Sequence, residues 1–198
     1  SGKAYTASGT TLTMSAAPTT GDSFYCIYQG KATQTVTPGN GTVSSAHMAA
    51  GVIPDNKPAF SAFMGSAQTG VAASTGTMIV CDSEDFDSDG AYNTSDGKFT
   101  VPAGEGGKYF LYANFRTNSS GTMTRCNLVL YKNNSTVISQ YNNNQVSNGE
   151  ASASVSFVGT LAAGDYVQSR IFQDSSSSVN VEAGNGKTMF MGYKLIGI

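Results

Sequence analysis

The sequence predicts an all-β protein in which short strands alternate with tight turns. Glycine supplies 23 of the 198 residues, and tryptophan is absent. Several segments alternate polar and apolar residues, which is the period of a half-buried strand. Dipeptides that favour tight reversals, such as Asp-Gly, separate these segments. The chain is long enough for one or two domains, and the larger can bury a substantial core.

The segment 90–112 is the most informative one, because it reads as turn, strand, glycine-rich turn and strand. Its Asp96-Gly97 dipeptide favours a hairpin, since glycine readily adopts the positive φ that such a turn requires. Phe99 and Val101 then alternate with polar residues, as expected for a strand with one buried face.

The last strand of this segment carries apolar residues on both faces. Successive side chains of a strand point to opposite sides, so Tyr109, Leu111 and Phe115 share one face. Phe110 and Tyr112 lie on the other face. A sandwich formed by a single chain needs to bury only its inner face. The second aromatic face therefore predicts a further contact surface, most simply a neighbouring subunit.

A series of short motifs together carries a family resemblance. In chain order they are Phe60-Ser61-Ala62, Asp85-Phe86-Asp87, Gly90-Ala91-Tyr92-Asn93, Gly97-Lys98-Phe99-Thr100-Val101-Pro102, Gly107-Lys108-Tyr109-Phe110, Gly164-Asp165-Tyr166-Val167 and Phe190-Met191-Gly192-Tyr193-Lys194-Leu195. In this order and at this spacing, they resemble the C1q/TNF-like domain over residues 57–198. The resemblance implies a ten-stranded jelly-roll sandwich that assembles as a homotrimer around a three-fold axis.

Within this head, we expect the core to come from strands near residues 107–116, 124–132, 153–161, 164–172 and 187–196. The side chains expected in the core or at a subunit interface are Tyr109, Leu111, Leu128, Leu130, Val155, Phe157, Ile171 and Phe190. The sequence leaves the division between core and interface open.

Two smaller regions precede the head. Residues 1–38 predict a small β module, the truncated end of a longer fibre, with strand signals at 10–15 and 23–29. Residues 39–56 predict a neck with a short helix over 42–51 that ends at a glycine. Such a short helix is marginal alone, so we expect three copies to pack on an axis. A flexible linker is the alternative.

The first region also carries a resemblance of its own. The motifs Tyr5-Thr6-Ala7-Ser8-Gly9-Thr10-Thr11-Leu12-Thr13, Gln34-Thr35-Val36 and Gly41-Thr42-Val43-Ser44-Ser45-Ala46 resemble segments of tail-fibre and other virion proteins of bacteriophages. His47 stands where such segments commonly carry lysine. The resemblance implies a viral fibre that ends in the head domain.

Composition excludes some partners. Charged residues make up 12% of the chain and the net charge is −2, so no basic surface for nucleic acid is expected. No stretch approaches the ~20 apolar residues of a membrane-spanning helix, so we expect no membrane insertion. Cys26, Cys81 and Cys126 lack the close pairing of zinc ligands. They are interpreted as buried free thiols, with one disulfide as the alternative.

The acidic stretch before the first hairpin suggests calcium. Asp85, Asp87, Asp89 and Gly90 match the first half of an EF-hand loop. An EF-hand needs flanking helices, however, whereas this stretch leads into the strand at Phe99. The alternative interpretation is an ordinary turn before a strand. Calcium is the one cofactor that the sequence suggests.

Catalysis has little support in the sequence. The one histidine, His47, lies in the predicted neck, far along the chain from the cysteines of the head. No Gly-x-Ser-x-Gly motif is present to expose a nucleophile. We therefore expect the protein not to be an enzyme.

Amide-rich loops near aromatic residues are the predicted binding surface. Such loops can bind sugar hydroxyls while a ring covers the apolar face of the sugar. The candidate receptor-binding residues are Tyr131, Asn133, Asn134, Tyr141, Asn142, Asn143, Asn144 and Gln173. The alternative is that they are ordinary turn residues. Three weak sites on one trimer would gain avidity of ~10² or more.

Together, the two resemblances predict a trimeric viral fibre tip, located on the virion. Its expected partners are further copies of the chain, other virion proteins upstream and a receptor on the host cell surface, most simply a glycan. Two alternatives stay open: a secreted, extracellular C1q-like recognition or signalling protein of a cellular organism, and a purely structural virion component.

Overall fold

The computed structural model describes residues 5–17, 19–21, 23, 25, 27, 55–118, 121–143 and 150–196. The chain divides into two compact units, residues 1–47 and 48–198, which are described separately below. The predicted neck helix over 42–51 lies outside the described residues. Among those described, no helix is long and apolar enough to cross a membrane.

The first unit contains a small antiparallel hairpin of β1 (Tyr5–Ser8) and β2 (Thr11–Met14). Gly9 has a φ of 58° at the first position of the two-residue loop, as a type II′ turn requires. The predicted strand at 10–15 therefore pairs with the segment before it. Tyr25 and Ile27, from the segment predicted as a strand at 23–29, are exposed and lie outside any strand. A two-residue loop closes this pairing with little loss of chain entropy, which favours it over a partner more distant in the sequence.

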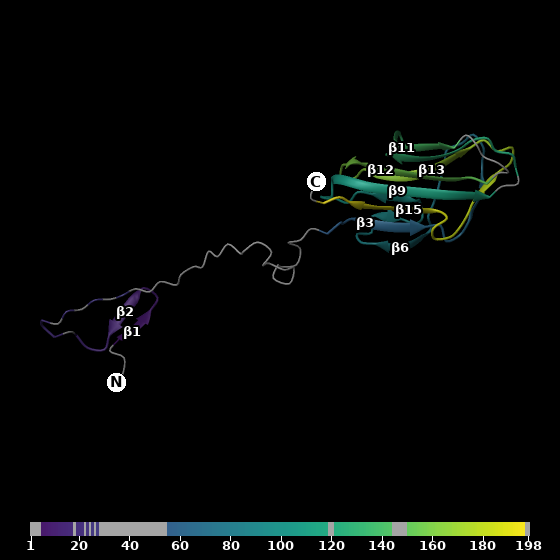
Figure 1. The fold of residues 1–198 in the computed structure, drawn as a ribbon. Helices are drawn as coiled ribbons and strands as arrows, with labels where there is room; N and C mark the ends of the chain where they lie inside the picture. The colour runs from purple at the N-terminus through teal and green to yellow at the C-terminus, as the bar shows by residue number, and fades with distance from the viewer. Residues whose placement is uncertain are drawn as a thin grey trace. The chain divides into compact units, whose positions relative to one another are not determined.

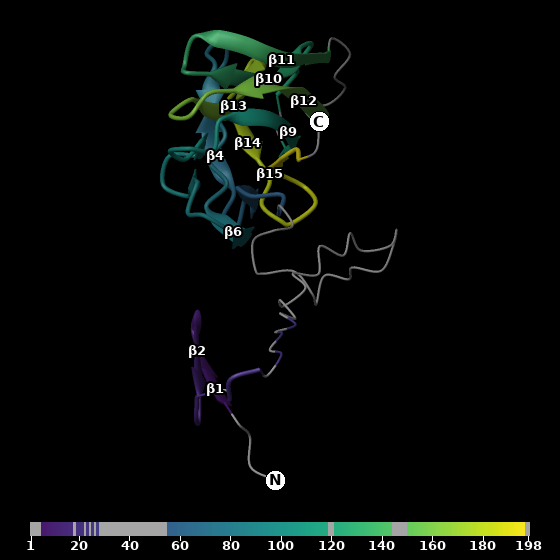
Figure 2. The same cartoon turned by 90° about the vertical axis from the view of Figure 1, so that its left-hand side faces the viewer.

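The second unit is a sandwich of two antiparallel sheets, which lie face to face in Figure 1 and Figure 2. In the part of the chain that the structure describes, one sheet has six strands in the order β11-β10-β13-β8-β7, and β5 also pairs with β13. Its strands are β5 (Thr77–Met78), β7 (Tyr92–Asn93), β8 (Lys98–Thr100), β10 (Cys126–Lys132), β11 (Thr136–Asn143) and β13 (Tyr166–Gln173).

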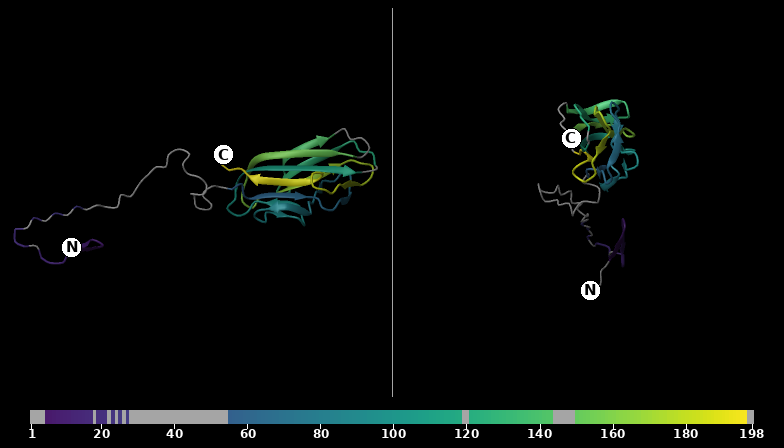
Figure 3. Two further views of the ribbon diagram at one scale, coloured as in Figure 1. Left: turned by 60° about the horizontal axis from the view of Figure 1, so that its bottom comes forward. Right: turned by 90° about the vertical axis from the view of Figure 1, so that its right-hand side faces the viewer.

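The other sheet has seven strands among the described residues. Six follow the order β4-β14-β9-β15-β3-β6, and the seventh, β12, also pairs with β9. Its strands are β3 (Ala59–Phe63), β4 (Gln68–Val71), β6 (Ser83–Asp87), β9 (Gly107–Asn118), β12 (Ser152–Leu161), β14 (Val179–Val181) and β15 (Met189–Lys194). Figure 3 shows teal β9 between green β12 and yellow β15. The all-β jelly-roll sandwich predicted from the sequence is confirmed.

Aromatic rings fill one part of the core between the sheets. The Phe60 ring stacks on Tyr92 at 5.2 Å and on Phe99 at 4.7 Å, measured between ring centroids. Phe190 meets Phe60 edge to face at 5.0 Å. Both geometries are the favourable ones for aromatic pairs. These contacts join β3, β7, β8 and β15, so the aromatic cluster holds the two sheets together.

The structure shows which of the residues predicted for the core or a subunit interface lie in the core. Tyr109, Leu111, Leu128, Leu130, Val155, Ile171 and Phe190 are buried within the single chain, and Phe157 is partly buried against them. Leu111 also lies against Gly192 of β15. A Cβ built at Gly192 would come within 2.3 Å of the Leu111 side chain and 2.8 Å of the Phe110 carbonyl oxygen. Glycine at this position therefore allows β9 and β15 to pack closely.

The cysteines of the head are buried free thiols, as predicted. Cys81 and Cys126 are both fully buried and unpaired with each other. Burial raises the pKa of each thiol to about 12, because the thiolate loses its hydration in an apolar environment. Cys26 lies outside the described residues.

Candidate functional site

One strand, β9, contributes side chains to both faces of its sheet. Tyr109, Leu111, Ala113 and Phe115 point into the core, and the residues between them point outward. This is the alternation predicted from the sequence. The outward residues of β9, together with those of β12 and β15 beside it, form what we call the β9 face.

The β9 face is apolar at the end of the head where β9 begins. We call this end the base, since the Lys194 amide donates there to the carbonyl of Pro58, near the start of the head. Phe110 lies in register between Val158 of β12 and Tyr193 of β15. The Phe110 and Tyr193 rings are 5.4 Å apart. Val158 is 64% exposed and Tyr193 is 37% exposed, so much of this apolar surface is uncovered in the single chain.

The same face is polar at the opposite end, which we call the far end. Asn114 of β9 lies opposite Ser154, and Arg116 lies opposite Ser152. A hollow of about 430 Å³ opens here. The side chains that line it include Tyr112, Asn114, Arg116, Tyr141, Ser152, Ser154 and Lys187. They supply hydroxyl, amide and cationic donors beside two aromatic rings.

Lys187 reaches the hollow from the turn that joins β14 to β15. The Gly184 amide donates to the Met64 carbonyl at 2.7 Å, and the Asn185 amide nitrogen donates to Asp85 at 3.1 Å. Asn114 closes the turn from the other side. Its Nδ2 donates to the Gly186 and Lys187 carbonyls, both at 3.4 Å, and its Oδ1 accepts from the Met189 amide at 3.1 Å. The turn is therefore fixed to the head at several points.

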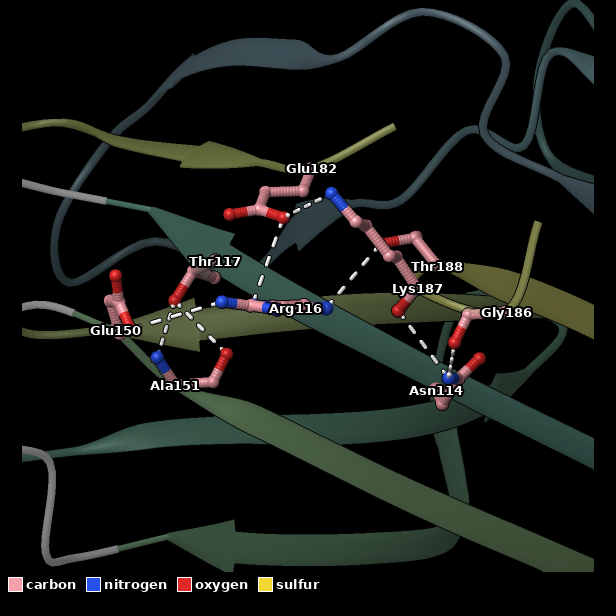
Figure 4. A network of polar contacts seen from close by, with 9 residues as sticks. All are labelled: Asn114, Arg116, Thr117, Glu150, Ala151, Glu182, Gly186, Lys187 and Thr188. Carbon is pink, nitrogen blue, oxygen red and sulfur yellow. Dashed lines mark hydrogen bonds and ion pairs between the residues drawn. The ribbon is translucent and has the colours of Figure 1, made fainter. Parts of the chain in front are cut away.

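Two carboxylates pair with the cations of the hollow (Figure 4). Glu182 lies 3.0 Å from Lys187 Nζ and 3.7 Å from Arg116 Nε. Glu150 lies 3.9 Å from Arg116 Nη2. The four side chains carry no net charge. The Glu182 side chain is only 17% exposed, whereas those of Arg116 and Lys187 are about half exposed.

Glu150 is brought to Arg116 by the pairing of Thr117 with Ala151. The two residues exchange backbone and side-chain hydrogen bonds: the Thr117 amide donates to the Ala151 carbonyl at 2.8 Å, and the Ala151 amide donates to Thr117 Oγ1 at 2.9 Å. Thr117 is fully buried. This junction, also drawn in Figure 4, fixes where β12 begins beside β9.

Among the residues predicted to bind a receptor, Tyr141 lies at the hollow, with 46% of the residue exposed. Asn142 and Asn143 follow it at the end of β11, and the Gln140 amide donates to Asn142 Oδ1. Asn144 lies outside the described residues. Tyr141, Asn142 and Asn143 of the predicted set therefore lie at the far end.

Asn133 and Asn134 instead lie at the base, in the turn between β10 and β11. Their φ angles are 51° and 61°, as the two central residues of a type I′ turn require. Asn133 Nδ2 donates to Asp165 at 2.7 Å, and its Oδ1 accepts from the Tyr166 amide at 2.9 Å. The hydrogen bond from Asn133 is the main cause that lowers the pKa of Asp165 below its ordinary value. Asn133 thus holds two turns together.

Tyr131 and Asn134 are also engaged within the head. The Arg170 guanidinium lies 4.8 Å from the centre of the Tyr131 ring, which places a cation over the ring face. The same guanidinium donates to Asn134 Oδ1. These side chains therefore pack against one another on β10, β13 and the turn.

The position of Gln173 differs from that expected of a receptor-binding residue. Gln173 is fully buried, so its side chain is not available to a receptor at the surface of the head. Its Nε2 donates to the Val71 carbonyl at 3.0 Å, and its Oε1 accepts from the Ser175 amide. A buried amide needs such partners, and here they join β13 to β4 and to the following loop.

The acidic stretch forms hydrogen bonds within the head, and calcium binding there stays a prediction. Asp85 accepts hydrogen bonds from Ser61 and Asn185. Asp87 accepts from the Tyr92 amide at 2.8 Å and from the Asp89 amide at 3.2 Å. In the described part of the chain, no three His, Cys, Asp or Glu side chains lie close enough together to hold a metal ion. The residues of the EF-hand pattern lie on the edge strand β6 and in the turn after it.

Sequence reasoning missed Arg116 and Lys187. Arg116 continues the outward series of β9 after Phe110, Tyr112 and Asn114, so the strand period alone could have placed it on the β9 face. Lys187 had no such signal, because its position depends on the turn between β14 and β15.

Comparisons with known proteins agree with this architecture. The sequence profile of the C1q domain family matches residues 59–195. No curated protein sequence matches the chain significantly. Among solved structures, murine APRIL at pH 5.0 is similar, with 12% identity, a TM-score of 0.52, and coverage of 69% of this chain and 98% of that chain.

Two further solved structures are similar with lower TM-scores. The globular domain of a zebrafish complement 1qA protein has 20% identity and a TM-score of 0.49, with 70% of this chain and 98% of that chain covered. The Eiger TNF of S. frugiperda has 15% identity and a TM-score of 0.48, with 72% and 96% covered.

Proposed function

The chain belongs to the C1q domain family, and from this premise we propose that it is the recognition head of a homotrimeric fibre tip that binds a glycan on a host cell surface. C1q and TNF-like domains act as trimeric binding modules. To this general role we add a location, the surface of a virion, and a class of ligand, a glycan.

The base of the β9 face supports trimer formation. Phe110, Val158 and Tyr193 form a contiguous apolar row that one chain leaves partly uncovered. Uncovered apolar patches of this kind mark interaction surfaces. In a closed ring of three copies, each copy presents this row to a neighbour.

The single observation that carries ligand binding is the hollow at the far end. It lies at the opposite end of the head from the base, where the Lys194 amide donates to the Pro58 carbonyl. Tyr112 and Tyr141 offer rings, and Asn114, Ser154 and Arg116 offer polar groups. Rings beside hydroxyl, amide and cationic groups are the chemistry that binds sugars.

The viral setting rests on the resemblance of residues 5–13, 34–36 and 41–46 to bacteriophage fibre segments. A fibre tip needs weak sites in several copies, because avidity then gives attachment without tight binding at any one site. Other virion proteins are the expected partners at the N-terminal side.

Attachment can be tested with the purified 198-residue chain, fluorescently labelled, on a panel of bacterial cells. We expect saturable binding by a trimer to some strains, and loss of that binding after periodate treatment, which destroys vicinal diols of surface sugars. Binding that resists periodate but disappears after protease treatment would contradict a glycan ligand. A monomer in light scattering at micromolar concentration would contradict the trimer.

A further inference from the structure

We propose that the hollow at the far end of the β9 face binds a carboxylate-bearing sugar residue, with Arg116 and Lys187 as the groups that recognise the charge. This inference rests on the proposed function and specifies the class of glycan. It follows from the charges, the donors, the rings and the rigidity of the hollow.

The charged side chains that line the hollow are both cations. Arg116 enters from β9 and Lys187 from the turn before β15, and neither Glu150 nor Glu182 is among the lining residues. Figure 4 shows the two carboxylates beside the two cations. A ligand in the hollow would therefore contact two cationic groups and no carboxylate among the lining residues.

Arg116 keeps hydrogen-bonding capacity for a ligand. Its distances to Glu182 and Glu150, 3.7 and 3.9 Å, exceed the ~3.2 Å of a good N–H···O bond. Its side chain is 48% exposed. A guanidinium presents paired N–H groups that match the two oxygens of a carboxylate. The acidic neighbours hold Arg116 in place and leave this fork open.

The remaining lining suits the body of a sugar. Tyr141 projects from β11 and Tyr112 from β9, while Ser152 and Ser154 project from β12. A ring can cover the apolar face of a sugar, and serine hydroxyls can donate to or accept from its hydroxyl groups. The hollow thus offers contacts to a sugar ring next to its contacts to a carboxylate.

The groups that recognise charge are held in position before a ligand arrives. Asn114 fixes the backbone of Gly186 and Lys187 to β9, and Asn185 is bound to Asp85. Ordering a loop on binding costs free energy, so a turn that is already fixed favours affinity.

A larger polyanion fits the surface less well. The hollow measures about 430 Å³, and the cluster of Arg116, Lys187, Glu150 and Glu182 has no net charge. Nucleic acid binding relies instead on extended rows of cations that meet successive phosphates. A single anionic sugar unit within a neutral stretch of glycan is the better match.

The test is a calorimetric titration of the trimeric 198-residue chain with three probes that carry one carboxylate each within an otherwise neutral oligosaccharide: a galacturonate, a glucuronate and a sialyl oligosaccharide. Each probe is matched by its carboxyl-reduced form, which keeps the sugar and removes the charge. We expect at least one acidic probe to bind, and its reduced form to bind at least about tenfold more weakly.

Variants assign the effect to the hollow. We expect Arg116→Gln and Lys187→Gln each to weaken the acidic probe by about tenfold and to leave the reduced form unchanged. Lys98→Gln is the matched control. It removes a cation of the other sheet, which pairs with Asp96 at 2.9 Å, and should not change the affinity.

Other outcomes overturn the inference. They are failure of all three acidic probes, equal affinity for reduced probes, equal loss in the Lys98 variant, or stronger binding of a sulfated oligosaccharide that persists in Arg116→Gln. Dissociation of the trimer in Arg116→Gln would place the hollow in a subunit contact, which also contradicts it. If the chain still binds cells in a periodate-sensitive way, the proposed function stands without this inference; if it binds no cells, both fail.

Discussion

The base and the far end of the β9 face share the same strands but differ in the polarity of the side chains around Phe110 and Arg116. At the base, Phe110 lies between two apolar neighbours, and at the far end Arg116 lies beside serine and lysine. The backbone pairing continues unchanged from one end to the other. Assembly and recognition can therefore occupy one sheet face, separated only by position along β9.

The turns at the two ends differ in a related way. At the base, Asn133 binds Asp165 and Tyr166 with short hydrogen bonds, which join two turns of the head. At the far end, Asn114 binds the turn of Lys187 with longer ones. Asparagine at the base thus joins two turns of the head, whereas asparagine at the far end holds the turn that carries Lys187.

The largest effect is expected for the apolar row at the base. The double variant Phe110→Asp with Tyr193→Asp places two charges in the proposed subunit contact. Association should weaken by ~10³ or more, because buried unpaired charges are costly. Light scattering should show a monomer, with an unchanged far-ultraviolet circular dichroism spectrum.

The matched control is Phe86→Asp. Phe86 is 54% exposed but lies on the edge strand β6, which β3 separates from β15. This control should remain trimeric. If the control dissociates and the Phe110 variant does not, the trimer contact lies elsewhere.

A smaller effect is expected for Asp165→Asn, which weakens the junction of the two turns at the base. Loss of its charge should lower the free energy of unfolding by ~1–2 kcal/mol at pH 7. The folded state lowers the pKa of Asp165, so its carboxylate stabilises the fold fully above its ordinary pKa near ~4. That contribution is lost as the pH falls further.

The difference between Asp165→Asn and the unmodified chain should therefore shrink as the pH falls from 5 towards 3. Urea unfolding at several pH values measures it. A difference that stays constant over this range would mean that the charge of Asp165 does not carry the effect.

The smallest effect on stability is expected at the far end. Asn114→Ala should change the free energy of unfolding by less than ~1 kcal/mol, because two of its three hydrogen bonds are long and its site is half-buried. The same change should weaken acidic sugar binding, since Lys187 is no longer held. An unchanged affinity with a large loss of stability would reverse the roles of the two ends.

The alternation of polar and apolar residues along a strand was enough to predict which side chains point into the core, because that direction depends only on adjacent positions in the sequence. The two faces of β9 follow from alternation alone, and residues such as Leu111 and Phe190 lie in the core as expected. Phe157 lies at the margin of the core, because burial there depends on the strands that happen to cover it.

The candidate site was harder to predict, because composition does not tell which amides face solvent. Gln173 and Tyr141 both follow from polar, aromatic-rich segments, yet one is buried and the other is exposed. Asn133 is a turn residue because both central positions have positive φ, which asparagine tolerates. Only tertiary pairing brings Lys187 to Arg116, and no local pattern encodes it.

The alternation along β9 also bears on how such a head can change over time. Outward residues at the far end are independent of the core residues between them and of the apolar row at the base. Substitutions at positions such as Asn114 or Arg116 can therefore alter what the head binds while the sandwich and its assembly persist. Under the proposed function, this end of one strand can vary with the cell-surface ligand while the rest of the head is kept.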